Sequence, residues 1–302
     1  MDIDLNELIY PVFVKSGKGL REEIPLMPGS FRLSPDALIQ EVAGLVDGGL
    51  KNFLIFGIPN EKTWHGSAAY SRDSIVAEAV RLLKSRFLDI TIFTDICLCA
   101  YISHGHCGII KSGEEEIALK ETLKALSEMA VVHAQAGADY VAPSAMAKGQ
   151  IAAIRKALNA NGYEHAKIMA YSAKFASNAY GPFRNVADSA PRFGDRSGYQ
   201  LDYSHKKEAL ARIEKDIDEG ADIVMVKPAL WYLDVVNEVK NKIKCPLAVY
   251  NVSGEYTMVK EGAKLGLWEE KKTINELLSS MKRAGADLII TYHAKEIARK
   301  EE

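Results

Sequence analysis

The feature that most constrains the fold of this chain is a motif that occurs three times. Each copy reads Gly-Ala-Asp followed by an apolar run, and the copies begin at Gly137, Gly220 and Gly285. Each copy follows a stretch with apolar residues at three- and four-residue spacing, which is typical of a helix. A glycine here suits a helix C-cap, and the apolar run suits a strand buried on both faces. The motif therefore predicts repeated helix-to-strand units.

Eight short apolar runs extend this arrangement along the chain. They cover residues 10–14, 53–58, 89–96, 138–145, 167–174, 221–228, 246–253 and 286–293. Helical patterns fill most of the gaps, and strands that alternate with helices pair in parallel through right-handed crossovers. We therefore predict an α/β fold, the closed (β/α)8 TIM barrel, with an open doubly wound sheet as the alternative.

The domain organisation follows from the absence of any linker rich in Pro, Gly and Ser. We predict a single barrel domain over residues 1–302, with a short N-terminal extension at residues 1–9. One long irregular stretch, about residues 177–200, contains scattered Gly, Pro and Arg. Such a loop inside a compact domain is usually functional, so we predict an active-site lid. A surface insertion without function is the alternative.

Composition and charge exclude several classes of protein. A net charge of -2 gives no electrostatic case for binding nucleic acid. No apolar run reaches the roughly 18 residues of a membrane span, and the start, MDIDLNELIY, lacks the basic region of a signal peptide. We expect a cytoplasmic protein with neither nucleic-acid nor membrane partners. Its four cysteines then indicate metal binding or catalysis rather than disulfides.

Polar residues close several of the predicted strands, at the rim where the active site of a barrel lies. These residues are Asp95, Ser144, Lys174, Lys227, Tyr250, Asn251, Ser253, Tyr292 and His293. Lysine is rarely buried without a partner, yet two lysines end apolar runs. Core packing does not explain this pattern, which indicates a catalytic site.

Lys174 and Lys227 end neighbouring predicted strands, which lie roughly 4.8 Å apart in a sheet. Two ammonium groups in a partly desolvated pocket lower each other's pKa, which leaves a free amine near neutral pH. Such an amine attacks a ketone or aldehyde to form a Schiff base. The alternative is that each lysine reaches solvent or pairs with a carboxylate.

A second group of candidate residues lies in the segment CLCAYISHGHC. Its three cysteines, Cys97, Cys99 and Cys107, can close around one soft cation such as zinc and leave a fourth position open for water or substrate. Buried or redox-reactive cysteines are the alternative. His104 and His106 lie in the same loop, either as spare ligands or as neighbours of the ligands.

Two arginines, Arg184 and Arg196, fall in the predicted lid. A guanidinium group binds a carboxylate through two parallel hydrogen bonds, so these arginines are candidates for substrate recognition. Solvated lid charges are the alternative.

Together these motifs resemble the porphobilinogen synthase (5-aminolevulinate dehydratase) family. The resemblance runs from IYPVFV to IITYHAKEIA and includes IPLMPGSFRLS, DICLCAYISHGHCGII, YSAKFASNAYGPFR, FGDRSGYQ, MVKPALWYLDVV and YNVSGEY. Motifs of this length in this order are far more specific than one short pattern. The resemblance implies a (β/α)8 barrel lyase (hydro-lyase) of tetrapyrrole (haem) biosynthesis. Such an enzyme condenses two molecules of 5-aminolevulinate into porphobilinogen.

The resemblance also assigns roles to individual residues, with Lys174 and Lys227 as the two Schiff-base lysines. The site of the first-bound substrate is matched by Lys227, Ser253 and Tyr292. The site of the second substrate is matched by Lys174, Arg184, Arg196 and Gln200. The zinc ligands are matched by Cys97, Cys99 and Cys107. Further active-site positions are matched by Asp95, Ser144, Tyr180, Phe183 and Tyr250.

The chain departs from the family after the fourth predicted strand, where the family usually reads Ser-Asp-Met-Met-Asp-Gly-Arg. Here Ala145, Lys148 and Gln150 stand in place of two carboxylates and a guanidinium. An acid at a catalytic face often contributes about 10²–10⁴-fold in rate. This departure leaves two alternatives open: a diverged paralogue with altered substrate or weak activity, and a silent homologue that serves as a zinc-binding or interaction protein.

Two further departures concern assembly and regulation. Family members carry an arm before the first strand that contacts a neighbouring subunit, and nine residues precede that strand here. The loop KSGEEEIALKE at 111–121 also lacks the family's Asp- and Asn-rich pattern. We expect a homo-oligomer, with dimer and octamer both open. Whether the protein binds an allosteric magnesium ion besides zinc also stays open.

Overall fold

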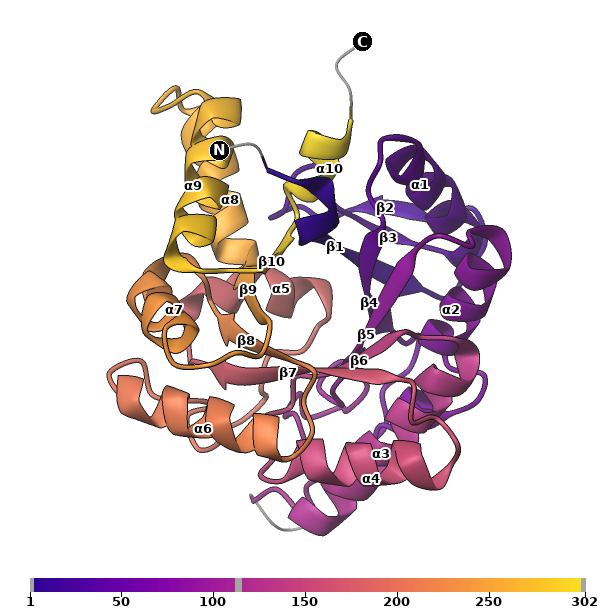
Figure 1. The fold of residues 1–302 in the computed structure, drawn as a ribbon. Helices are drawn as coiled ribbons and strands as arrows, with labels where there is room; N and C mark the ends of the chain where they lie inside the picture. Colours follow the sequence, from indigo (N-terminus) through magenta and orange to yellow (C-terminus); the bar gives the residue numbers. More distant parts are fainter. Residues whose placement is uncertain (1–2, 112–115, 300–302) are drawn as a thin grey trace.

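The chain folds into a closed barrel of eight parallel strands, as described by a computed structural model for residues 3–111 and 116–299 (Figure 1). The barrel strands are β1 (Leu8–Lys15), β4 (Asn52–Ile58), β5 (Thr91–Ile96), β6 (Tyr140–Pro143), β7 (Lys167–Lys174), β8 (Ile223–Lys227), β9 (Leu247–Asn251) and β10 (Leu288–Thr291). Each pairs with the next, and β10 pairs with β1 to close the ring. Every predicted apolar run overlaps one of these strands, so the predicted barrel is confirmed.

Helices follow most strands and surround the ring (Figure 1). They are α1 (Pro35–Asp47), α2 (Ile75–Arg86), α3 (Leu119–Ala136), α4 (Gln150–Ala160), α6 (Lys206–Asp218), α7 (Leu233–Lys240), α8 (Ser253–Lys264), α9 (Glu270–Ala284) and the short α10 (Ala294–Ala298). Two short strands, β2 (Arg21–Glu23) and β3 (Phe31–Leu33), extend the sheet beside β1. Because helices cover the outer face and side chains fill the interior, the strands read as continuous apolar runs.

The glycines of the repeated motif end helices, as predicted. Gly137 and Gly285 follow α3 and α9 with φ values of 106° and 119°, a left-handed conformation in which a residue with a Cβ is strained. Gly220, after α6, has a φ of 102°. The chain can therefore turn from helix to strand within three or four residues.

The aspartate of the same motif joins neighbouring units at the amino-terminal rim of the barrel. Asp139 Oδ2 accepts a hydrogen bond from the backbone N–H of Ile92 at 2.7 Å and pairs with Lys84 of α2 at 2.6 Å. The equivalent partners are Ile168 and Arg155 for Asp222, and Leu247 and Lys240 for Asp287. Each carboxylate thus accepts a hydrogen bond from a backbone N–H at the start of an adjacent strand, and it also forms an ion pair with a basic side chain of a helix.

A β-bulge in β7 decides where its last residue points. Met169 and Tyr171 lie in the interior cluster of the barrel, whereas Ala173 packs outside. The pairing of β7 with β8 shifts between Ala170 and Ala173. Since an extra residue in a strand reverses the alternation of its side chains, Lys174 turns toward the same interior as Tyr171.

The stretch 177–200 contains more helix than the sequence predicts. A 3₁₀ turn (Asn178–Tyr180) leads into α5 (Gly181–Val186), whose first turn carries Pro182, and only the remainder lacks regular structure. A proline is favoured in the first turn of a helix because its missing N–H is not needed there. The role of this stretch as a lid and the single-domain organisation stay predictions.

Part of two further predictions lies outside the described residues, namely residues 1–2 of the N-terminal extension and 112–115 of the loop at 111–121. Within the described ranges, no helix is long and apolar enough to cross a membrane.

Candidate active site

The two candidate lysines lie side by side at the carboxyl rim of the barrel. Lys174 and Lys227 are register partners at the ends of β7 and β8, and each is only 6% exposed. The ammonium of Lys174 donates a hydrogen bond to the carbonyl of Ser144 at 2.6 Å. Burial, and next the charge of Lys174, lowers the pKa of Lys227 well below its usual range. The amine of Lys227 is therefore available as a nucleophile.

Aromatic rings surround the amine of Lys227. Its Nζ lies 4.0 Å from the ring centre of Tyr250, 5.0 Å from that of Tyr171, 5.3 Å from that of Tyr180 and 5.6 Å from that of Phe183. Three of these rings were predicted at the site. Tyr171 was missed, because simple alternation along the strand does not place it in the same interior as Lys174.

Asp95 lies near both lysines and near Cys107. Burial raises the pKa of Asp95 to about 6, against the opposing effects of a hydrogen bond from Ser144 and the charges of Lys174 and Lys227. Its Oδ1 has no hydrogen-bond partner among the described residues. A carboxyl group with such a pKa can both release and accept a proton near neutral pH.

The three predicted cysteines form one group able to hold a metal ion. The Sγ atoms of Cys97, Cys99 and Cys107 all lie within 4.8 Å of one another, and all three side chains are buried. Three thiolates on one tetrahedral zinc ion lie about 3.8 Å apart, so small movements of the side chains would bring the three sulfur atoms to zinc-binding distances. Hydrogen bonds from Cys97 and Cys99 lower the pKa of the Cys107 thiol, and Arg196 and Lys174 add to the effect. The donor set therefore fits a soft cation.

Arg184, Arg196 and Gln200 line a cavity of about 570 Å³ beside the stretch 177–200. The Nε atoms of both arginines and both side-chain amide atoms of Gln200 have no hydrogen-bond partner in the described part of the chain. Arg196 and Gln200 are nevertheless buried. The other nitrogens of Arg196 are partly committed, since its Nη2 donates to Gly105 O at 2.9 Å. The cavity is thus lined by two guanidinium side chains, which are suited to an anion.

The hydroxyl groups predicted to bind the first substrate lie at the ends of β9 and β10. Ser253 begins α8, and its Oγ accepts the N–H of Phe183 at 3.0 Å and contacts the carbonyl of Ala179 at 3.4 Å. The hydroxyl of Tyr292 lies 3.2 Å from that of Tyr250. The hydroxyl of Tyr180 is committed to two backbone carbonyls of the neighbouring strands.

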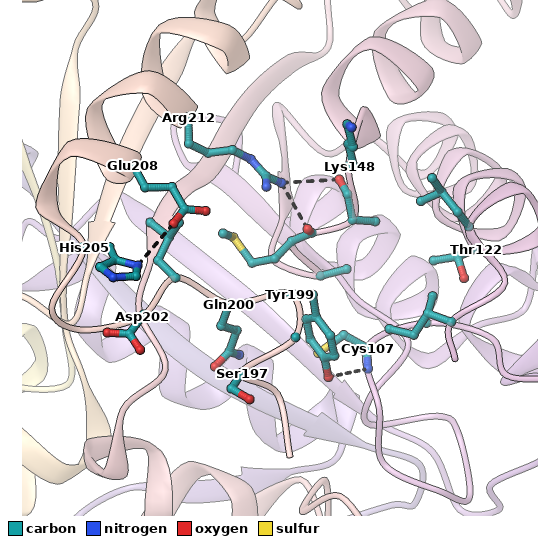
Figure 2. A pocket seen from close by; sticks show the side chains of 18 residues that line it. Cys107, Thr122, Lys148, Ser197, Tyr199, Gln200, Asp202, His205, Glu208 and Arg212 are labelled. Carbon is teal, nitrogen blue, oxygen red and sulfur yellow. Dashed lines mark hydrogen bonds and ion pairs between the residues drawn. The ribbon is translucent and has the colours of Figure 1, made fainter. Parts of the chain in front are cut away.

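The departure after β6 borders a second cavity of about 420 Å³, which Figure 2 shows from close by. Ala145 and Lys148 line it together with Cys107. Gln150 is buried, where it accepts the N–H of Ala147 at 3.2 Å and donates to the carbonyl of Pro143 at 3.3 Å. Gln150 thus stabilises the loop after β6 by hydrogen bonds to its backbone. Ala145 and Lys148, which replace the two acids, line the cavity instead.

Comparison with known proteins gives a consistent result along the whole chain. Residues 1–300 match the family model described as delta-aminolevulinic acid dehydratase. Curated proteins of that name are similar to this chain at 53% identity in Methanothermus sociabilis and 50% in Archaeoglobus fulgidus. Both alignments cover 97% of this chain and 90% of the relative.

Solved structures agree with this result. The delta-aminolevulinic acid dehydratase (porphobilinogen synthase) of Toxoplasma gondii, in complex with the reaction product porphobilinogen, is similar with a TM-score of 0.96 and 41% identity. That alignment covers 98% of this chain and 85% of the other. A dihydropteroate synthase of Xanthomonas albilineans, with a TM-score of 0.51 and 10% identity, covers 97% of this chain and 89% of its own, and shares the fold alone.

Proposed function

The chain belongs to the delta-aminolevulinic acid dehydratase family, and from that premise we propose that it is a porphobilinogen synthase. It condenses two molecules of 5-aminolevulinate into porphobilinogen with the loss of two waters. The observation that carries the proposal is the pair of buried, register-matched lysines in one barrel mouth. A diverged paralogue is not favoured, because relatives at about 50% identity over 97% of the chain bear the same name.

Each lysine forms a Schiff base with the ketone of one substrate molecule. The lone pair of the amine attacks the carbonyl carbon, and the carbonyl oxygen leaves as water. Lys227 acts without prior loss of a proton, because burial and its neighbour keep the amine neutral. Asp95 supplies or removes protons at the carbon and oxygen atoms that react, which its raised pKa permits.

The carboxylate of each substrate is bound away from the reacting carbon. Arg184, Arg196 and Gln200 hold one carboxylate, and their place in the lining of one cavity supports this role. Ser253 and Tyr292 hold the other carboxylate. Holding both ends of both substrates converts the condensation into an effectively unimolecular step. The stretch 177–200 acts as the lid that brings the arginines to the site.

We propose that the metal of the three cysteines is zinc. Three soft thiolate ligands favour zinc over magnesium, which takes oxygen ligands. When bound, zinc supplies a Lewis acid that polarises an oxygen atom of the second substrate or activates a bound water. No group of three magnesium-type ligands accompanies it among the described residues, so we do not extend the proposal to magnesium.

The decisive experiment is to incubate the purified protein with 5-aminolevulinate and detect a pyrrole with an acidic aldehyde reagent. We expect colour that grows with time and requires zinc. Reduction with borohydride during turnover should fix a substrate adduct on Lys227, located by peptide mass spectrometry. An adduct without pyrrole would replace the proposal with different carbonyl chemistry, and the absence of both would make the chain a silent homologue.

We also propose, from family membership, that the protein acts in the cytoplasm as a homo-oligomer. Light scattering of the zinc-loaded protein would distinguish a dimer from an octamer. A monomer that retains full activity would contradict this part of the proposal.

A further inference from the structure

The loop that carries the cysteines also contacts the lid directly. The carbonyl of His104 accepts the N–H of Arg192 at 3.1 Å, and the carbonyl of Gly105 accepts a hydrogen bond from Arg196 at 2.9 Å. Gly105 has a φ of 75°, and a Cβ added there would lie 2.3 Å from the carbonyl of Ala190. Only glycine allows the two backbones to approach so closely. We call these contacts of residues 104–106 with residues 190–199 the seam.

The side chain of His106 makes the seam specific. Its Nε2 lies 3.0 Å from the carbonyl of Phe193, which can only accept, so Nε2 carries the proton. Its Nδ1 lies 3.3 Å from the hydroxyl of Tyr199. That hydroxyl in turn accepts the backbone N–H of Cys107 at 3.4 Å (Figure 2). Since both nitrogens are engaged, His106 is committed to the lid and is not a spare metal ligand.

The seam connects the cysteine cluster with the part of the lid that carries the proposed carboxylate-binding residues. Cys97 and Cys99 begin the loop and Cys107 ends it, so a cation held by all three fixes both ends of the segment that includes His106. On the other side of the seam lie Arg196 and Gln200, which belong to the lid. A movement of the loop therefore displaces the groups proposed to bind a substrate carboxylate.

We propose that His106 is a positioning residue that transmits the state of the cysteine site to the lid, so that metal binding orders residues 187–200 and thereby strengthens binding of the second substrate. The inference rests on the proposed function for the identity of that substrate. The coupling itself concerns the protein and the metal alone, and it can be measured without turnover.

The test measures hydrogen–deuterium exchange of peptides covering residues 187–201, in protein stripped with a chelator and in the same protein reloaded with zinc. We expect zinc to slow exchange in this segment by about tenfold, which corresponds to one or two hydrogen bonds becoming persistent. Peptides from α6 and α7, which do not contact the loop through the seam, serve as internal references. Equal exchange with and without zinc in the unmodified protein would overturn the inference.

The variant His106→Ala separates metal binding from lid ordering. We expect it to bind one zinc ion per chain, as measured by elemental analysis, but to lose the zinc-dependent protection. The KM for 5-aminolevulinate should rise about tenfold with little change in kcat, because the lost contact acts on binding. His106→Gln, whose amide can still donate to Phe193, should recover most of both effects. His65→Ala, on a nearby exposed loop, is the matched control.

The two hypotheses fail in different ways. If no pyrrole forms but zinc slows exchange only when residue 106 can donate, the inference stands and the proposed function falls. If the enzyme is active and His106→Ala keeps the full zinc-dependent protection, the inference falls and the function stands. If a variant does not fold, which thermal melting would reveal, the exchange of the unmodified protein still tests the coupling, because equal exchange with and without zinc overturns it.

Discussion

The two rims of the barrel differ in how far their polar groups are paired within the protein. At the amino-terminal rim, the aspartates of the repeated motif each accept a backbone N–H and pair with a helix cation, as Asp139 does with Ile92 and Lys84. At the carboxyl rim, buried atoms such as Asp95 Oδ1 and the hydroxyl of Tyr171 have no partner among the described residues. An unpaired buried polar group costs about 1–3 kcal/mol, so one rim contributes stability and the other reserves its groups for ligands.

The two rims also differ in how their charged side chains are arranged. Opposite charges meet at the amino-terminal rim, whereas the carboxyl rim brings basic side chains together. Arg184 lies beside Arg196, and Lys227 lies beside Lys174, which lowers the pKa of Lys227. Like charges destabilise a folded chain unless a substrate or an ion neutralises them. The comparison predicts large effects on activity from one rim and effects on stability from the other.

The largest effect should come from Lys227→Ala. Removal of the proposed covalent nucleophile should lower kcat by about 10⁴-fold or more, and borohydride should no longer fix substrate at this position. Steady-state pyrrole formation measures the first effect and peptide mass spectrometry the second. Lys156→Ala, on the exposed face of α4, is the control. Retention of a tenth of the activity by Lys227→Ala would contradict the assignment.

Loss of the metal should have the next largest effect. Cys99→Ala leaves two thiolates, too few for a stable zinc site, so the zinc content should fall from about one ion per chain to near zero. Pyrrole formation should fall with it. Cys245→Ala is a matched control, because this partly exposed cysteine lies outside the cluster, where it packs against the hydrophobic core and donates to the carbonyl of Asp222. Intact zinc content in Cys99→Ala would remove the ligand assignment.

The two rims also differ in how much the sequence reveals. The eight strands, the helix-ending glycines and the two lysines follow from periodicity and residue type, because these signals are local. The partners of the motif's aspartates and the inward turn of Lys174 do not, since they depend on register and on the bulge between Ala170 and Ala173. The contact of His106 with Phe193 spans 87 positions and has no local signal. Only the resemblance placed Gln200 in the site.

A smaller effect is expected where the chain departs from its family. Ala145→Asp restores a carboxyl group at the wall shared by the cavity of Figure 2 and the cysteine cluster. We expect kcat to rise by about tenfold, toward the low end of what a positioned acid contributes. Ala145→Asn, of similar size and uncharged, is the control. No difference in rate between the two variants would mean that this position does not matter for the chemistry.

The smallest effect on rate is expected at the amino-terminal rim, where a substitution should change stability but not kcat. Asp139→Ala leaves the N–H of Ile92 without its acceptor and removes the ion pair of Lys84, which keeps only the carbonyl of Ile90, so the free energy of unfolding should fall by about 1–2 kcal/mol. The value of kcat should not change, because the barrel separates this residue from the lysine pair. Asp89→Ala removes an aspartate from a largely exposed pair with Lys51, and it should alter neither quantity, because solvent screens such a pair. Urea unfolding and pyrrole formation measured on the same samples test both expectations. A fall in kcat together with the fall in stability of Asp139→Ala would contradict the view that one rim serves stability and the other activity. The motif would then act on the site through the strands it joins.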